Sequence, residues 1–190
     1  MDVFDVLTER GFVKQCSDEA GLRNLFAKKE NVVFYVGFDP TADSLHIGSL
    51  VPIMAMAHLQ KAGNTPICII GGGTAMIGDP SGKTKMRRIM NQSEIEENCS
   101  KIASQIKRYL TPQKNLIFAN NAEWLLNLKY IDFLRDIGRH FKVNEMIKSE
   151  AYKQRLDRQE GLSFIEFNYQ LLQAYDFLVL FDKHNCRLQM

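Results

Sequence analysis

The segment from Ile77 to Lys85, IGDPSGKTK, ends in the letters of a phosphate-binding loop. A P-loop needs four residues between its two glycines and a strand that runs directly into it. Here only three residues separate Gly78 from Gly82, and the six residues GGGTAM intervene between the apolar run at 66–70 and this segment. The segment is therefore not predicted to be a P-loop. This segment and the residues just after it contain a basic cluster, Lys83, Lys85, Arg87 and Arg88, which is as typical of a solvated loop as of a phosphate site.

A second candidate is the sequence DPTADSLHIGSL at 39–50, which directly follows an apolar run. Its Asp-Pro pair ends a strand, and a helix must begin soon after His46. If Ser49 caps that helix, Pro52 falls in its first turn, where a missing backbone N–H does no harm. The unpaired N–H groups and His46 would then form an anion site, and Gly48 would let a flat base approach the backbone. An ordinary turn and helix cap would explain the same residues.

A third candidate lies in the helical pattern at 163–181, where Tyr169, Gln173 and Asp176 are spaced i, i+4 and i+7. This spacing places them within an arc of roughly 60° on one helix face. A polar stripe is usually the wet face of a helix. However, tyrosine is unusual on a wet face, and the rest of this helix is strongly apolar, so the stripe is also a candidate wall of a binding pocket.

Apolar runs alternate with stretches of helical spacing along the chain. Strands are predicted for residues 31–38, 66–70 and 115–119, with a further strand beginning at 186–190. Helices are predicted for residues 44–62, 93–110, 131–140, 143–156 and 163–181, and the pattern is already helical from Trp124. Ser93 and Glu96 would form a capping box, and the charged segment 152–161 is predicted to be an exposed connector. The alternation predicts an α/β fold with a parallel sheet, whose ligands bind at the carboxyl ends of the strands.

Composition narrows the class of protein. A chain of 190 residues is expected to form one domain with a substantial core. Its net charge of +2 is too small to imply nucleic-acid binding by itself, and no apolar run approaches the ~18 residues of a membrane span. The four cysteines are scattered without a C-x-x-C pair, which favours reduced thiols over a zinc site. We therefore expect a cytoplasmic protein with no membrane association and no metal centre.

Four blocks of sequence resemble the bacterial-type tyrosyl-tRNA synthetases of class I. They are YVGFDPTADSLHIGSL, GDPSGK, FLRDIGRHF and SFIEFNYQLLQAYDFLVL, in the order and at the separations of that family. The resemblance implies a Rossmann-like parallel sheet with helices on both faces, forming the nucleotide-binding domain over residues 1–190. It also implies a helical connective insertion at about 123–162.

The resemblance implies the reaction of a tyrosine–tRNA ligase. The carboxylate of L-tyrosine attacks the α-phosphorus of ATP to give tyrosyl-adenylate, and the tyrosyl group then passes to tRNA(Tyr). Mg²⁺ is expected to accompany ATP, and no tightly bound cofactor is expected. The family also implies a homodimer formed through 131–141, although an ordinary amphipathic helix would explain that segment as well.

The resemblance also assigns roles to residues that match the family motifs. The residues expected to contact the phosphates and carry catalysis are Thr41, His46, Lys83 and Arg87. The residues expected beside the rest of the nucleotide are Asp39, Gly48 and Ser49. The residues expected to bind tyrosine are Tyr35 and Asp176 at its phenolic hydroxyl, and Asp79, Tyr169 and Gln173 at its ammonium group. No residue is expected to bind a metal.

The chain departs from the family pattern in three places. Ser49 stands where the signature has its second histidine, and we expect it to cap the helix and to alter the nucleotide contacts. Val36 stands where many members have a cysteine that reaches the ribose. The sequence ends at Met190, before a GSDQWGN-like segment, a KMSKS-type loop and an anticodon-binding domain. We therefore expect the N-terminal part of the ligase, and the alternative is a non-catalytic module that binds tyrosine or a protein partner.

Overall fold

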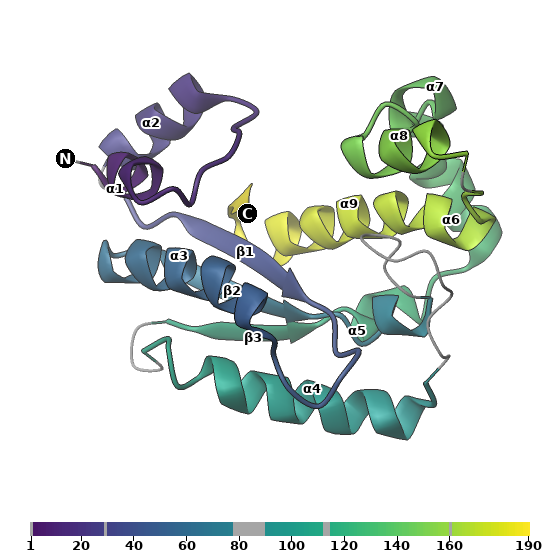
Figure 1. The fold of residues 1–190 in the computed structure, drawn as a ribbon, viewed down its shortest axis with the longest axis horizontal. Coiled ribbons are helices and arrows are strands. Elements are labelled where there is room, and N and C mark those ends of the chain that lie inside the picture. The colour runs from purple at the N-terminus through teal and green to yellow at the C-terminus, as the bar shows by residue number, and fades with distance from the viewer. Residues whose placement is uncertain (1, 29, 78–89, 112–114, 160) are drawn as a thin grey trace.

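The predicted parallel sheet is present. The computed structural model describes residues 2–28, 30–77, 90–111, 115–159 and 161–190 (Figure 1). Within these residues, parallel strands form a sheet in the order β3-β2-β1-β4. The strands are β1 (Val33–Phe38), β2 (Thr65–Ile70), β3 (Ile117–Asn120) and β4 (Cys186–Gln189). All four predicted strands are therefore confirmed, with boundaries shifted by up to two residues.

The helices account for most of the remaining described chain. The longer ones are α1 (Val3–Glu9), α2 (Glu19–Ala27), α3 (Leu50–Lys61), α4 (Gln92–Ile106), α6 (Tyr130–Asp136), α8 (Glu150–Asp157) and α9 (Phe164–His184). The shorter ones are α5 (Ala122–Leu125) and α7 (Val143–Met146), with the 3₁₀ turns η1 (Ile47–Ser49), η2 (Thr74–Met76) and η3 (Gly138–His140). In Figure 1, α6, α7 and α8 gather around the N-terminal end of α9, at the opposite end of the molecule from α1 and α2.

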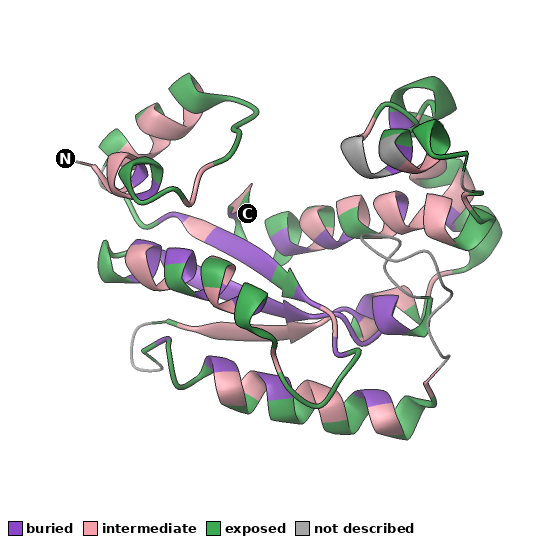
Figure 2. Ribbon diagram, in the orientation of Figure 1, coloured by how far each residue is buried: buried purple, intermediate pink, exposed green. Residues whose placement is uncertain are grey.

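Helices cover both faces of the sheet because strand side chains alternate between them. Phe34, Val36 and Phe38 of β1 pack in one cluster with residues of α3 and α4. Tyr35, which lies between them in sequence, packs in a second cluster with Trp124 of α5 and with α9. Figure 2 shows buried residues along β1 and β2, which lie between the two helical layers. The expected fold class, an α/β sheet with helices on both faces, is confirmed.

The predicted capping box of α4 is wrong by two residues. The observed box joins Asn91, whose side chain accepts from the backbone N–H of Glu94, to the Glu94 carboxylate, which accepts from the N–H of Asn91. Both pairs match the same pattern, a small polar residue followed three positions later by glutamate, and asparagine caps as well as serine does. The local pattern therefore does not decide between them, and the observed box starts α4 at Gln92, one residue before the predicted start.

The segment 152–161 is only partly the exposed connector that was predicted: residues 153, 156–159 and 161 are exposed, but α8 covers the segment as far as Asp157. Tyr152 is buried, and its hydroxyl lies 3.1 Å from the Glu166 carbonyl oxygen, to which it donates. The Arg155 guanidinium pairs with the Glu166 carboxylate at 2.7 Å and donates to the Gly161 carbonyl oxygen. One of the charged residues in this segment, Arg155, therefore fastens α8 to the start of α9.

No helix among the described residues is long and apolar enough to cross a membrane.

Asn64 fixes the start of β1 beside β2. Its buried side chain accepts from the Val32 backbone N–H at 3.1 Å and donates to the Leu59 carbonyl oxygen at 3.1 Å. Asn64→Ala leaves both groups without their partner in a buried place, so we expect the free energy of unfolding to fall by about 1–3 kcal/mol. Urea unfolding followed by circular dichroism measures this change.

The matched control is Asn127→Ala. Asn127 is exposed and bonds only locally, to the Glu123 carbonyl oxygen. Its replacement should change the free energy of unfolding by less than about 0.5 kcal/mol. Equal effects of the two substitutions would show that Asn64 does not link the strands.

Candidate active site

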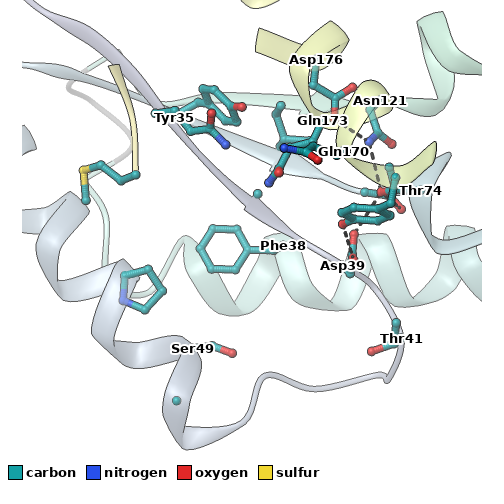
Figure 3. Close-up of a pocket in the computed structure, with 18 of the residues that line it drawn as sticks. Tyr35, Phe38, Asp39, Thr41, Ser49, Thr74, Asn121, Gln170, Gln173 and Asp176 are labelled. Atoms are coloured by element: carbon teal, nitrogen blue, oxygen red, sulfur yellow. Dashed lines mark hydrogen bonds between the residues drawn. The ribbon is translucent and has the colours of Figure 1, made fainter. Parts of the chain in front are cut away.

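A cavity of about 570 Å³ opens at the carboxyl ends of the strands. Its walls come from the residues that follow β1 and β2, from η1, from one face of α9 and from the end of β4 (Figure 3). This is the edge of a parallel sheet at which ligands bind. The cavity is therefore where the predicted site residues should meet.

Most of the predicted site residues do line this cavity. They are Tyr35, Asp39, Thr41, His46, Gly48, Ser49, Tyr169, Gln173 and Asp176. The residues Asp79, Lys83 and Arg87 lie in the segment 78–89, outside the described residues. The polar stripe of α9 is thus a cavity wall rather than a wet face, since Asp176 is buried and Tyr169 is half-buried.

Asp176 is a buried carboxylate with both oxygens engaged. Its Oδ1 accepts from the Trp124 indole N–H at 2.7 Å, and its Oδ2 accepts from the Asn121 side-chain amide at 3.0 Å. Asn121 is itself only 1% exposed, and its Oδ1 accepts from the Gly73 backbone N–H at 2.8 Å. The carboxylate is therefore held in one orientation by groups that are themselves fixed.

The same chain of hydrogen bonds continues to Asp39. The second amide hydrogen of Asn121 is directed to the Thr74 hydroxyl at 3.2 Å, and Thr74 lies 3.0 Å from Asp39 Oδ1, to which it donates. Asp39 Oδ2 accepts from the Tyr169 hydroxyl at 2.9 Å. Figure 3 shows Asp39, Thr74, Asn121 and Asp176 in this order. Because the Tyr169 proton is directed to Asp39, the lone pairs of its hydroxyl remain suited to accept from a cation.

Gly71 makes this arrangement possible. A Cβ atom at this position would collide with the Asp39 carboxylate and with the Thr74 hydroxyl. The backbone at Gly71 is also fixed to β1, because its N–H donates to the Phe38 carbonyl oxygen at 2.9 Å. A residue with a side chain would therefore displace the carboxylate from its partners.

Burial raises the pKa of Asp176 to about 6. The hydrogen bonds from Asn121 and Trp124 favour the charged form and lower the pKa, but loss of hydration outweighs them, and the nearby Asp39 charge adds to the increase. At pH 7 the carboxylate is still mostly ionised. It is a strong acceptor in a place that water reaches poorly.

Tyr35 brings an unsatisfied hydroxyl to the same cavity. The residue is 2% exposed, and no hydrogen-bond partner of its hydroxyl is found within the described part of the chain. Burial, followed by the charge of Asp176, raises the pKa of Tyr35 above its ordinary value, so the hydroxyl stays protonated. Its ring packs against Phe177 at a centroid distance of 5.4 Å. A buried hydroxyl without a partner is rare and points to a ligand group that completes it.

A β-bulge turns Gln189 into the cavity. Val33 pairs with Cys186, but Phe34 pairs with Leu188, so Arg187 is an extra residue on β4. Cys186 consequently packs on the Tyr35 side of the sheet while Leu188 packs on the opposite side. Gln189, which is paired with Tyr35, then lines the cavity. Bulges commonly re-aim side chains next to functional sites in this way.

The other side of the cavity is formed by the loop after β1 and by η1. Figure 3 shows Thr41 and Ser49 on the side away from Asp176. Ser49 is at the N-cap position of α3 as predicted, but its side chain makes no capping hydrogen bond, so that part of the prediction is wrong. Its φ of −70° and ψ of −18° are helical, which continues η1 into α3 and removes the need for a side-chain cap. A Cβ on Gly48 would lie 3.0 Å from atoms of the His46 ring, so glycine allows the two to pack closely.

Sequence reasoning missed several residues that line the cavity or support it. They are Gly71, Thr74, Asn121, Trp124, Tyr152, Gln170 and Gln189. Thr74 and Asn121 each follow the end of a strand, and this position is the signal that points to them. Gln170 has a buried side-chain oxygen with no partner among the described residues.

Within the part of the chain that the structure describes, no group of three or more His, Cys, Asp or Glu side chains is placed to hold a metal ion. The four cysteines are free thiols, of which Cys68 and Cys186 are buried.

Comparison with known proteins identifies the family. The family model described as "tRNA synthetases class I (W and Y)" matches residues 27–189. The curated tyrosine–tRNA ligases of Desulfatibacillum aliphaticivorans and Syntrophus aciditrophicus (strain SB) are 55% and 57% identical to this chain over 190 residues. Each match covers 100% of this chain and 44% of the relative. The chain therefore spans less than half the length of these relatives.

Solved structures agree with this assignment. A C-terminally truncated mitochondrial tyrosyl-tRNA synthetase from Aspergillus nidulans has a TM-score of 0.83 and 29% identity, over 99% of this chain and 56% of that one. A tyrosyl-tRNA synthetase from Archaeoglobus fulgidus, solved in complex with L-tyrosine, has a TM-score of 0.67 and 21% identity, over 95% of this chain and 53% of that one. The second likeness shows the shared fold alone.

The raised pKa of Asp176 makes stability depend on pH. Between pH 4 and pH 6 the folded chain holds a proton on Asp176 that the unfolded chain has lost, so the contribution of this residue to stability falls as pH rises. We expect the free energy of unfolding of the wild type, minus that of Asp176→Asn, to fall by on the order of 3 kcal/mol from pH 4 to pH 7. Urea titrations at several pH values measure this difference.

Asp182→Asn, on the exposed surface of the same helix, is the matched control. It makes the same change from carboxylate to amide without touching a buried group. A pH-independent difference for Asp176 would mean that burial does not control its titration.

Proposed function

Because this chain belongs to the class I tRNA synthetases for tryptophan and tyrosine, we propose that it forms the tyrosine- and ATP-binding part of a tyrosine–tRNA ligase. The proposed reaction joins the carboxylate of L-tyrosine to the α-phosphorus of ATP, releasing pyrophosphate. Transfer of the tyrosyl group to tRNA(Tyr) follows in the complete enzyme. The names of the relatives at 55% and 57% identity support tyrosine as the amino acid.

The observation that carries the proposal is the pair formed by Asp176 and the unsatisfied hydroxyl of Tyr35. A phenol is both a donor and an acceptor, so the hydroxyl of tyrosine can donate to the Asp176 carboxylate and accept from Tyr35. Phenylalanine would leave the buried Tyr35 hydroxyl without a partner and would deprive the buried Asp176 carboxylate of a third donor, which is unfavourable. The cavity thus has the chemistry of a tyrosine site.

The ammonium group of tyrosine would lie beside Tyr169 and Gln173, with Asp39 behind them. The Tyr169 hydroxyl already donates to Asp39, which directs its lone pairs to the cavity and places a negative charge next to the ammonium site. Charge-assisted hydrogen bonds of this kind are about twice as strong as neutral ones. Asp79 is proposed to join this group from the segment 78–89.

ATP would occupy the side of the cavity formed by Thr41, His46, Gly48 and Ser49. No covalent enzyme intermediate is needed, so catalysis would rest on positioning and on stabilising charge at the departing phosphates. Thr41 and His46 are proposed to contact those phosphates, together with Lys83 and Arg87. Mg²⁺ would arrive bound to ATP rather than to a protein site.

We further assign residues 1–190 to the nucleotide-binding domain and residues 123–162 to its helical insertion. The four free thiols support a reducing, cytoplasmic setting. The alternative function is a module that binds tyrosine or a protein partner without activating anything. Pyrophosphate exchange separates the two, because a module would bind tyrosine without exchanging pyrophosphate into ATP.

Homodimer formation is proposed through the helices around α6. Large apolar side chains are exposed on this part of the molecule. They are Tyr130, Ile131, Val143, Ile147, Phe164 and Ile165. The exposed fraction of Ile131 reaches 71%, which is unfavourable in water unless a partner covers it.

Calorimetric titration with tyrosine and with phenylalanine tests the proposed site. Tyrosine should bind, and phenylalanine should bind at least tenfold more weakly because it leaves the Tyr35 hydroxyl unpaired and brings no donor to the Asp176 carboxylate. Tyr35→Phe should weaken tyrosine binding about tenfold and leave phenylalanine binding unchanged. The same substitution removes an unsatisfied buried hydroxyl, so the free energy of unfolding without ligand should rise by about 1 kcal/mol.

Equal affinity of the wild type for tyrosine and phenylalanine would contradict the proposed roles of Tyr35 and Asp176. Preferential binding of tryptophan would point to the other amino acid of the family.

Sedimentation velocity of Ile131→Asp tests the dimer. A charge at a buried apolar interface is strongly unfavourable, so the variant should sediment as a monomer under conditions in which the wild type is dimeric. The control is Tyr109→Asp, whose residue is 47% exposed and lies just beyond the C-terminal end of α4, and this variant should remain dimeric. A monomeric wild type would exclude the proposal for this chain.

A further inference from the structure

Helix α4 holds the loop that carries Thr41 and His46. The Gln105 side-chain oxygen accepts from the Leu45 backbone N–H at 3.0 Å, and its amide nitrogen donates to the Asp43 carbonyl oxygen at 3.2 Å. Nearer the start of the loop, the Asn98 side chain donates to the Pro40 carbonyl oxygen at 3.1 Å. These contacts join residues 58 to 62 positions apart in the sequence. The loop is therefore fastened by one helix that follows it far along the chain.

α4 is a rigid support for these contacts. It is capped at its start by the Asn91–Glu94 box, and its buried Ile95, Ile102 and Ile106 face the interior of the molecule. Asn98 and Gln105 are seven residues apart, so they lie on the same side of the helix, next to the buried stripe. The packing of the helix therefore fixes the backbone positions from which Asn98 and Gln105 reach the loop.

Among the described residues, few contacts other than the turn of η1 fix the loop near His46. Residues 41–44 and His46 itself are exposed, and the Leu45 side chain is only partly buried against the core. The Lys101–Asp43 ion pair spans 3.8 Å between exposed side chains, and exposed pairs of this kind contribute little. Asn98 holds the distant end of the loop. On the side of the loop that precedes His46, the two hydrogen bonds of Gln105 are the nearest described polar contacts, while on the other side the His46 carbonyl oxygen accepts from the Ser49 backbone N–H at 2.9 Å.

We propose that Gln105 is a positioning residue that holds His46 at the mouth of the cavity by bonding the backbone at Asp43 and Leu45. Gln105 does not line the cavity, and its effect is exerted through the chain that leads into His46. Its importance for catalysis rests on the proposed function, in which His46 contacts the phosphates of ATP. The structural part of the proposal, the fixed loop, does not depend on that function.

The test compares Gln105→Leu with Gln92→Leu. Leucine keeps the volume of glutamine and removes both hydrogen bonds of its amide. Gln92 lies on the same helix and is exposed, and its side chain bonds to Glu96. The two variants therefore share the chemical change and the helix, but only one of them acts on the loop.

Hydrogen exchange and nuclear magnetic resonance report on the loop without any enzyme activity. In Gln105→Leu the Leu45 amide should exchange about tenfold faster and the ring signal of His46 should move, while amides of β1 and β2 keep their protection. Gln92→Leu should change neither. Unchanged exchange at Leu45 together with an unmoved His46 signal would overturn the proposal.

Pyrophosphate exchange then tests the catalytic part. Gln105→Leu should lower kcat about tenfold with the KM for tyrosine changed less than twofold, and Gln92→Leu should leave both constants unaltered. In a His46→Ala background Gln105→Leu should cause no further loss, because it acts through His46. An equal loss in both backgrounds would show that Gln105 acts elsewhere and would overturn its positioning role.

The failure of the proposed function has a different signature. If the wild type exchanges no pyrophosphate, the catalytic proposal for this chain is wrong, while the exchange rate of Leu45 and the His46 signal still decide whether Gln105 holds the loop.

Discussion

The structure depends on the burial of one ionised carboxylate, that of Asp176, beneath the carboxyl end of the sheet. A charge removed from water has to be stabilised by donors of good geometry, or the group takes up a proton instead. Asn121 and Trp124 supply those donors, at 3.0 and 2.7 Å. The segment after β3 therefore has to place the Asn121 amide and the Trp124 indole N–H against the same carboxylate. The pKa of about 6 shows that the donors only partly offset the loss of hydration.

The same network joins the strands to one another at the site. Asn121 follows β3, Thr74 follows β2 and Asp39 follows β1, and each is bonded to the next. The strand ends cannot shift independently without breaking a buried hydrogen bond, so the geometry of the cavity is fixed before any ligand enters. Tyr35 is the exception. Its hydroxyl has no partner in the described chain, and this reduces stability in exchange for a group ready to bind a phenol. Under the proposed function, the unpaired hydroxyl of the ligand-free state lies where tyrosine is distinguished from phenylalanine.

The sequence alone predicts those features that depend on local patterns. The alternation of strand and helix patterns along the chain predicts the parallel sheet, and the spacing at 163–181 predicts the shared face of Tyr169, Gln173 and Asp176. The helices on both faces of the sheet are implied by the family resemblance. Partnerships across long separations have no local signal: Trp124 and Asp176 are 52 residues apart, and Trp124 alone reads as an ordinary core residue. Two sites satisfy the same local capping rule, so the sequence alone does not determine which of them caps α4. The helix predicted at 143–156 covers α7 and most of α8, but the pairing of Arg155 with Glu166 is tertiary and the bulge at Arg187 depends on the neighbouring strand, so neither has a local signal.

The two sides of the cavity are built on different physical principles. The side with Asp176 is buried and internally bonded, which under the proposed function suits an aromatic side chain that must be distinguished by a single hydroxyl. The side with Thr41 and His46 is an exposed loop whose backbone is held from outside by α4. Under the proposed function, ATP has to enter and pyrophosphate has to leave on this side, so its side chains have to stay accessible from solvent. Support from a neighbouring helix meets this requirement, because Asn98 and Gln105 fix the backbone of the loop while its side chains remain exposed.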